Sequence, residues 1–179
     1  MRLTAALLPE LDLEMSYTRR HLARVPMDKL DFQPHDKSMT LGWLATFLAI
    51  LPTWGTLTIE RDSFDVAAPG AAPRRDVARS HTELLGMFDA HVAATRAAIA
   101  AANDEQLQRP WSLLAGGRVI FTQPRYLVFR TYFLNHMIHH RAQLGIFLRL
   151  NGVSVPAVYN DSGDERGGMF VDVRGHTDS

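Results

Sequence analysis

The chain has 179 residues, which fits one domain of ordinary size with a substantial core. Nineteen Lys and Arg residues balance nineteen Asp and Glu residues, so the composition gives no electrostatic reason to expect a nucleic-acid partner. Cysteine is absent, which excludes disulfides, thiolate metal sites and a cysteine nucleophile and permits a reducing cytoplasm. No uninterrupted apolar run approaches the roughly 18 residues of a membrane span, so we expect a cytoplasmic protein with no membrane partner.

The first half of the chain contains two helical patterns separated by a loop. Apolar residues at three- and four-residue steps predict a helix over residues 3–24, which Pro26 ends. Residues 25–38 hold two prolines and alternating charges, which is typical of a connecting loop. A second helix should follow Ser38 or Thr40, either of which could cap it, and should kink or break at Pro52.

The second half contains two further helical patterns and a short segment of another kind. A third helix is expected over residues 76–103. Between residues 107 and 123, two short apolar runs flank a glycine pair, which predicts either a short hairpin or an irregular crossover. Pro124 should open the longest helix, which runs to Leu150 and stops at Asn151-Gly152.

Together these patterns predict an all-α fold. We expect a four-helix bundle over residues 1–165, with long crossover connections and a short hairpin before the last helix. Residues 166–179 are glycine-rich and charged, which predicts a flexible C-terminal tail.

Two histidines on the last helix are the strongest candidates for a functional site. Each residue advances about 100° around a helix, so His136 and His140 lie about 40° apart and their rings can meet at one point. Two imidazoles could share a metal ion, but a catalytic zinc usually has three protein ligands. The spacing alone is a weak signal, because buried histidines that hydrogen-bond a carbonyl or water are common. The alternative is a pair of hydrogen-bonded core residues without a pocket.

Three stretches of the chain resemble the DinB and YfiT-like family. The resemblance covers nearly the whole chain, and its HxxHHRxQL block is fairly specific. It implies a helical bundle with a divalent ion, often nickel or zinc, held by three histidines. Two of these map to His136 and His140, and the third maps to a position that Phe47 occupies here. The stretches are residues 38–49 with Trp54, residues 135–144, and residues 148–152 leading to Val155, Pro156 and Tyr159.

Phe47 changes what the resemblance implies. Phenylalanine has no lone pair to offer a metal, so the three-histidine site cannot form in its usual way. Three outcomes remain open. A carboxylate of the C-terminal segment could complete the site, the ion could bind weakly through the two histidines and water, or no metal binds. The candidate carboxylates are Asp161, Asp164 and Glu165.

The family resemblance also implies an activity. Such relatives include metal-dependent transferases that move a low-molecular-weight thiol onto a small-molecule substrate, with the ion acting as a Lewis acid. In this chain Phe47, Trp54 and Phe133 would line the pocket, while His139 and Arg141 would either support the ligands or face solvent. The alternative is a non-catalytic binding or stress-associated module that has lost its metal. The resemblance further implies a homodimer.

Overall fold

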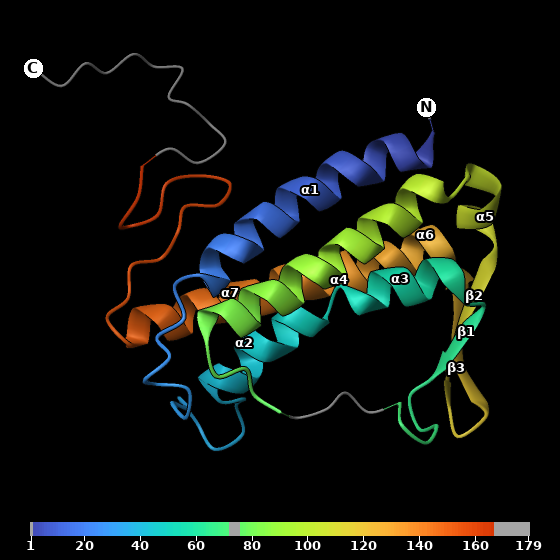
Figure 1. The fold of residues 1–179 in the computed structure, drawn as a ribbon. Helices are drawn as coiled ribbons and strands as arrows, with labels where there is room; N and C mark the ends of the chain where they lie inside the picture. The colour runs from blue at the N-terminus through green and yellow to red at the C-terminus, as the bar shows by residue number, and fades with distance from the viewer. Residues whose placement is uncertain (1, 72–75, 167–179) are drawn as a thin grey trace, which may run out of the picture.

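The computed structural model describes residues 2–71 and 76–166 of the chain. Most of these residues belong to helices that lie side by side, and a small sheet covers one end of the helical layer (Figure 1). The longer helices are α1 (Leu3–Leu22), α2 (Leu41–Ile50), α3 (Thr53–Glu60), α4 (His81–Ala101) and α7 (His136–Leu150). The shorter elements are α5 (Asp104–Gln108), α6 (Arg125–Val128), the π-helix η1 (Phe129–Asn135), and the strands β1 (Ser63–Asp65), β2 (Pro110–Ala115) and β3 (Arg118–Pro124).

Local signals place several helix ends where the sequence predicts them. The Thr40 hydroxyl accepts a hydrogen bond from the Trp43 N–H at 3.2 Å, so Thr40 caps α2. The expected break at Pro52 is confirmed, because α2 ends before it and α3 begins after it. The third predicted helix begins later than expected, at His81, where the Ser80 hydroxyl accepts from the Glu83 N–H and caps α4.

The expectation of an all-α four-helix bundle is wrong, because a three-stranded mixed sheet is part of the fold. The hairpin is present as antiparallel β2 and β3, and the unexpected strand β1 pairs in parallel with β2. The Asp65 carboxylate at the end of β1 accepts hydrogen bonds from the N–H groups of Gly116 at 2.9 Å and Gly117 at 2.7 Å. This turn needs glycine, since Gly116 and Gly117 have φ angles of +59° and +77°.

The long helical stretch that contains the histidines is continuous but not uniformly α-helical. It runs through α6, η1 and α7, and it ends as predicted at Asn151, followed by Gly152 with a φ of +73°. A π-helical stretch has the wider i→i+5 turn, and such stretches often occur at functional sites. The π-helix ends directly before His136, so it sets the direction in which the histidine face points.

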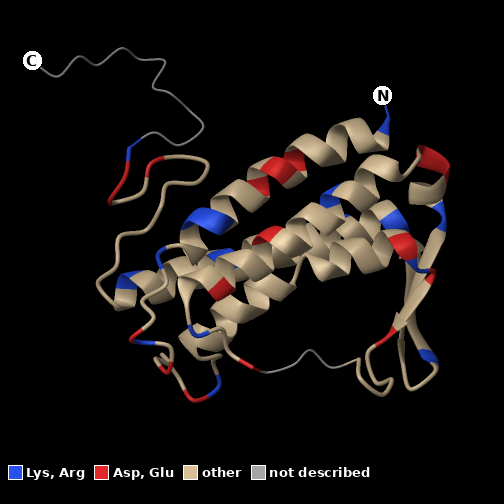
Figure 2. Cartoon of the chain, viewed as in Figure 1, with Lys and Arg blue, Asp and Glu red and all other residues tan. Residues whose placement is uncertain are grey.

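The core lies between the helices, and charged residues of both signs are interspersed over the described part of the chain (Figure 2). Exposed ion pairs join α1 to α4 through Arg19–Asp89 at 2.8 Å and Arg96–Asp12 at 2.9 Å. The stretch Leu41–Glu60 is long and apolar enough to cross a membrane by composition, but 61% of its apolar window is buried inside the molecule. That burial is typical of a core helix in a soluble protein.

The segment after α7 folds back along α1. Glu165 forms ion pairs with Arg20 and with Arg24, and the Tyr159 hydroxyl donates to the Glu14 carboxylate at 2.8 Å. These contacts hold residues 153–166 against the helices. The flexible tail expected at 166–179 lies outside the described residues from position 167 onward.

Candidate functional site

His136 and His140 meet as their spacing predicts. Their Nε2 atoms lie 2.8 Å apart, which is a hydrogen-bond distance, and the ring centroids are 4.6 Å apart. His140 is buried and His136 is half-buried. Burial lowers the pKa of both imidazoles, and hydrogen bonds to Tyr132 and Gln143 partly offset that effect.

A hydrogen bond between the two Nε2 atoms requires a proton on one of them. His140 Nδ1 contacts the Gln143 Oε1 at 2.7 Å, and His136 hydrogen-bonds the backbone of Tyr132. In one arrangement the His140 ring donates to Gln143 and the His136 ring donates to the Tyr132 backbone. Each neutral ring then has its lone pair on Nε2, so a hydrogen bond between the rings needs one additional proton that the two Nε2 atoms share. If the Gln143 amide is turned over so that it donates, His140 carries its proton on Nε2 and the pair is neutral. Both arrangements put an N–H on the line that joins the rings.

The donor set does not fit the three-histidine metal site that the resemblance implies. Phe47 occupies the third position, and its ring packs edge-on against His140 at 5.0 Å and lies 5.6 Å from His136. No group of three His, Asp or Glu side chains within residues 2–71 and 76–166 could hold an ion.

The carboxylates considered as replacements for the third histidine are engaged elsewhere. Asp164 pairs with Arg149 at 2.6 Å and accepts from the Val155 N–H. Glu165 pairs with Arg20 of α1 and with Arg24 just beyond the end of that helix. Asp161 is exposed and does not form part of any three-residue ligand group within the described chain.

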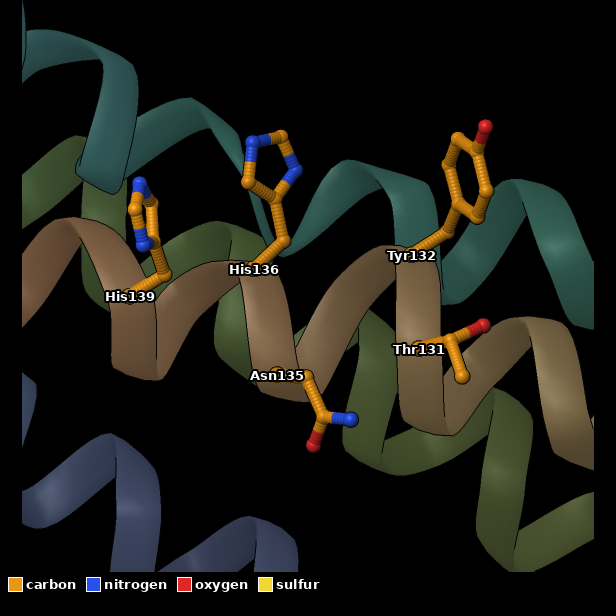
Figure 3. A pocket seen from close by; sticks show the side chains of 5 residues that line it. All are labelled: Thr131, Tyr132, Asn135, His136 and His139. Atoms are coloured by element: carbon orange, nitrogen blue, oxygen red, sulfur yellow. The ribbon is translucent and has the colours of Figure 1, made fainter.

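A pocket of about 370 Å³ opens beside the histidine pair (Figure 3). Figure 3 shows the side chains of His136, His139 and Tyr132 pointing to one side of the helix, while Asn135 points to the other. The lining combines imidazole, phenol, amide and hydroxyl groups and contains no described carboxylate. It can therefore accept and donate hydrogen bonds without carrying a fixed negative charge.

An aromatic cluster adjoins this pocket on the side of the sheet. The Tyr132 ring lies 4.8 Å from Phe121 of β3 and 6.2 Å from Trp54 of α3, and Trp54 lies 5.3 Å from Phe64 of β1. The sheet therefore supplies two of the aromatic rings that support the pocket residue Tyr132. Flat rings of this kind favour an aromatic or apolar ligand.

The other residues singled out from the sequence occupy different places. None of the three expected lining residues belongs to this pocket: Phe47 packs against the histidine pair, Trp54 belongs to the aromatic cluster, and Phe133 is fully buried 5.1 Å from Phe129. His139 is exposed and lines the pocket, with its ring 4.9 Å from His140. Arg141 does not contact the histidine pair and instead turns toward α1.

Arg141 belongs to a buried polar cluster with Glu14 and Tyr159. Its guanidinium donates to the Glu14 carboxylate at 2.7 Å and to the Tyr159 hydroxyl at 2.9 Å, and that hydroxyl donates to Glu14. The Arg141 and Glu14 side chains are only 3% and 6% exposed. The guanidinium also lies 5.6 Å from the centroids of the Tyr17 and Tyr159 rings.

A DinB family model matches residues 4–166. The chain belongs to the DinB family. No curated protein matches it, but solved structures of DinB-like proteins do. A DinB-like protein from Bacillus subtilis has 18% identity and a TM-score of 0.64, covering 84% of this chain and 95% of its own. One from Bacillus cereus has 20% identity and a TM-score of 0.67, covering 88% and 98%.

Reasoning from the sequence missed several residues of this DinB site. Gln143 follows His140 by three residues, a spacing that brings side chains together on a helix. It is the glutamine of the HxxHHRxQL motif. Tyr132 and Asn135 reach the pocket because η1 is a π-helix, which the local sequence does not indicate. Glu14 carries a charge, yet it is only 5% exposed because Arg141 pairs with it in the interior.

Proposed function

We propose that this DinB-family chain binds a small organic molecule beside the histidine pair and does so without a metal ion. The observation that supports this is the direct 2.8 Å contact between the two Nε2 atoms, which is a hydrogen-bond distance. The edge of Phe47 packs against the same two rings. The two nitrogens that would hold an ion thus contact each other at hydrogen-bond distance. Phe47, at the position of the third ligand, offers only carbon atoms.

The pocket chemistry indicates the kind of ligand. His139, Asn135 and Thr131 supply hydrogen-bonding groups, and Tyr132 is supported by further aromatic rings. We expect a ligand of modest size with one planar apolar part and one polar group that reaches His139. Thermal-shift measurements with small aromatic alcohols, phenols and carboxylic acids test this. Stabilisation of the parent that His139→Gln abolishes supports the pocket, and stabilisation that persists in His139→Gln contradicts it.

The rival hypothesis is the metal-dependent thiol transferase that the resemblance implies. The two hypotheses differ in zinc affinity, and Phe47→His separates them because it adds a nitrogen where the ring edge now lies. Phe47→Leu is the matched control, since it removes the ring without adding a ligand. We expect Phe47→His to bind zinc or nickel roughly 100-fold more tightly than the parent and Phe47→Leu, because three histidines complete an open site.

The measurement uses protein prepared without a histidine tag, with metal content by elemental analysis and affinity by competition with a chromogenic chelator. If the parent binds zinc as tightly as Phe47→His, or conjugates a thiol only when metal is added, the metal-free proposal is wrong. The homodimer and the cytoplasmic location remain predictions. Sedimentation equilibrium of the full chain tests the first of these.

A further inference from the structure

A second pocket, of about 360 Å³, lies between the C-terminal end of α1, the last turns of α7 and the returning segment after α7. Its lining includes the apolar side chains of Ile146, Leu150 and Val155. Ile146 and Leu150 are 60% and 58% exposed, which is unusual for large apolar residues. The one cation in the lining, Arg149, is paired with Asp164 at 2.6 Å.

His21 supplies an unused hydrogen-bond acceptor to this pocket. The residue is 3% exposed, and its Nδ1 lies 2.9 Å from the Tyr17 carbonyl oxygen, so Nδ1 carries the proton. In the neutral ring the lone pair is therefore on Nε2, which has no hydrogen-bond partner among the described residues. A Cβ built on Gly145, another lining residue, would lie 3.8 Å from this Nε2, so the nitrogen borders the cavity where α7 has no side chain.

The surroundings keep His21 neutral. Burial lowers its pKa to about 4, and the positive charges of Arg141 and Arg20 act in the same direction. The Tyr17 backbone bond and Glu165 oppose this shift without cancelling it. At neutral pH the ring therefore accepts hydrogen bonds through Nε2, and a molecule in the pocket can donate to it.

We propose that this pocket binds a small uncharged molecule with an apolar body and a single hydroxyl or N–H group, which donates a hydrogen bond to Nε2 of His21. The apolar walls exclude a charged ligand, since the lining's only cation is already paired and burial of another charge is costly. The site is separate from the histidine pair, so the proposal does not depend on whether that pair binds a metal.

The test compares 4-ethylphenol with 4-ethylanisole, which have nearly the same shape although only the phenol can donate a hydrogen bond. Each is titrated into the full 15N-labelled chain, and the His21 ring nitrogens are followed by NMR. We expect the phenol to bind at least about tenfold more tightly and to shift the Nε2 resonance of His21. Equal affinities, an unchanged His21 resonance, or no binding at the solubility limit would overturn the proposal.

Two glycine variants control for the place of binding. Gly145→Ala puts a methyl group 3.8 Å from His21 Nε2 and 3.5 Å from Val155, both ordinary contacts, so the fold tolerates it while the approach to the nitrogen is blocked. Gly86→Ala on α4 meets nothing within 4 Å and serves as the matched control. We expect phenol affinity to fall about tenfold in the first variant only. Equal phenol affinity of the two glycine variants would show that the phenol binds elsewhere, and this would refute the proposal. A His21 resonance that changes with protein concentration in the absence of phenol would show that a second copy of the chain occupies the pocket, which would also refute it.

Discussion

Replacing Arg141 with methionine should destabilise the protein strongly, because Arg141 and Glu14 form an ion pair in the interior. The two side chains are 3% and 6% exposed, and the closest nitrogen and oxygen are 2.7 Å apart. Arg141→Met keeps much of the apolar bulk but leaves the Glu14 carboxylate buried, with the Tyr159 hydroxyl as its remaining side-chain donor. Removing one partner of a buried pair costs about 3–5 kcal/mol, so we expect a loss in that range.

Comparison variants isolate the cause. Arg19→Met removes an arginine from the exposed pair with Asp89, and exposed pairs contribute about 0–1 kcal/mol. Tyr159→Phe removes one hydroxyl from the cluster but keeps the ion pair, so its cost should be about 1–2 kcal/mol. Replacing Glu14 and Arg141 together with methionine should recover part of the Arg141→Met loss, because no buried charge is left without a partner.

Equilibrium urea unfolding at pH 7 measures these differences. For a chain of this size each kcal/mol corresponds to about 2–4 °C, so Arg141→Met should lower Tm by about 6–20 °C. The m value should stay constant if only the native state is affected. An Arg141→Met loss no larger than that of Arg19→Met would refute the reasoning, since the buried pair would then behave like an exposed one.

Two further predictions concern stability. The pKa of His21 falls from 6.5 to about 4 on folding, so the unfolded chain binds more protons between these values and stability is lost as pH falls through this window. The loss is about 3 kcal/mol, and His21→Gln should remove it from a series of urea titrations between pH 4 and 7. Gly55→Ala should cost about 1–3 kcal/mol, because its Cβ would lie 2.4 Å from Thr95 Cγ2 and 3.0 Å from the Phe133 ring. Thermal melts of both glycine variants check this, and Gly86→Ala should leave stability unchanged or raise it. Equal effects of the two alanines would contradict the prediction for Gly55.

Features with a local cause could be predicted from the sequence. Thr40 caps a helix because its hydroxyl reaches an N–H three residues away, and Pro52 breaks one because its ring prevents a helical hydrogen bond. Gly152 ends α7 with a positive φ. The pairing of His136 with His140 also follows from helical spacing alone. Each of these rests on atoms within about one helical turn.

Features that depend on distant partners could not be predicted. Strand β1 has three residues, and its pairing depends on β2, which begins at Pro110. The position of β1 against β2 is held by the Asp65 carboxylate, which accepts hydrogen bonds from the N–H groups of Gly116 and Gly117. These residues lie 51 and 52 positions later in the chain. Glu14 is buried only because Arg141 lies 127 residues later in the chain. Periodicity describes one segment at a time and contains no information about such pairs.

The π-helix explains why the histidine pair can border a pocket although the preceding turns are in the core. In an unbroken α-helix, Phe129, Phe133, His136 and His140 would share one apolar face. In the structure both phenylalanines are fully buried, while His136 is half-exposed beside Tyr132. The wider turn of η1 changes the phase of the helix between the two sets of residues. The core contacts of Phe133 are thereby kept, and the two imidazoles turn toward Phe47, so one helix serves both the core and the site.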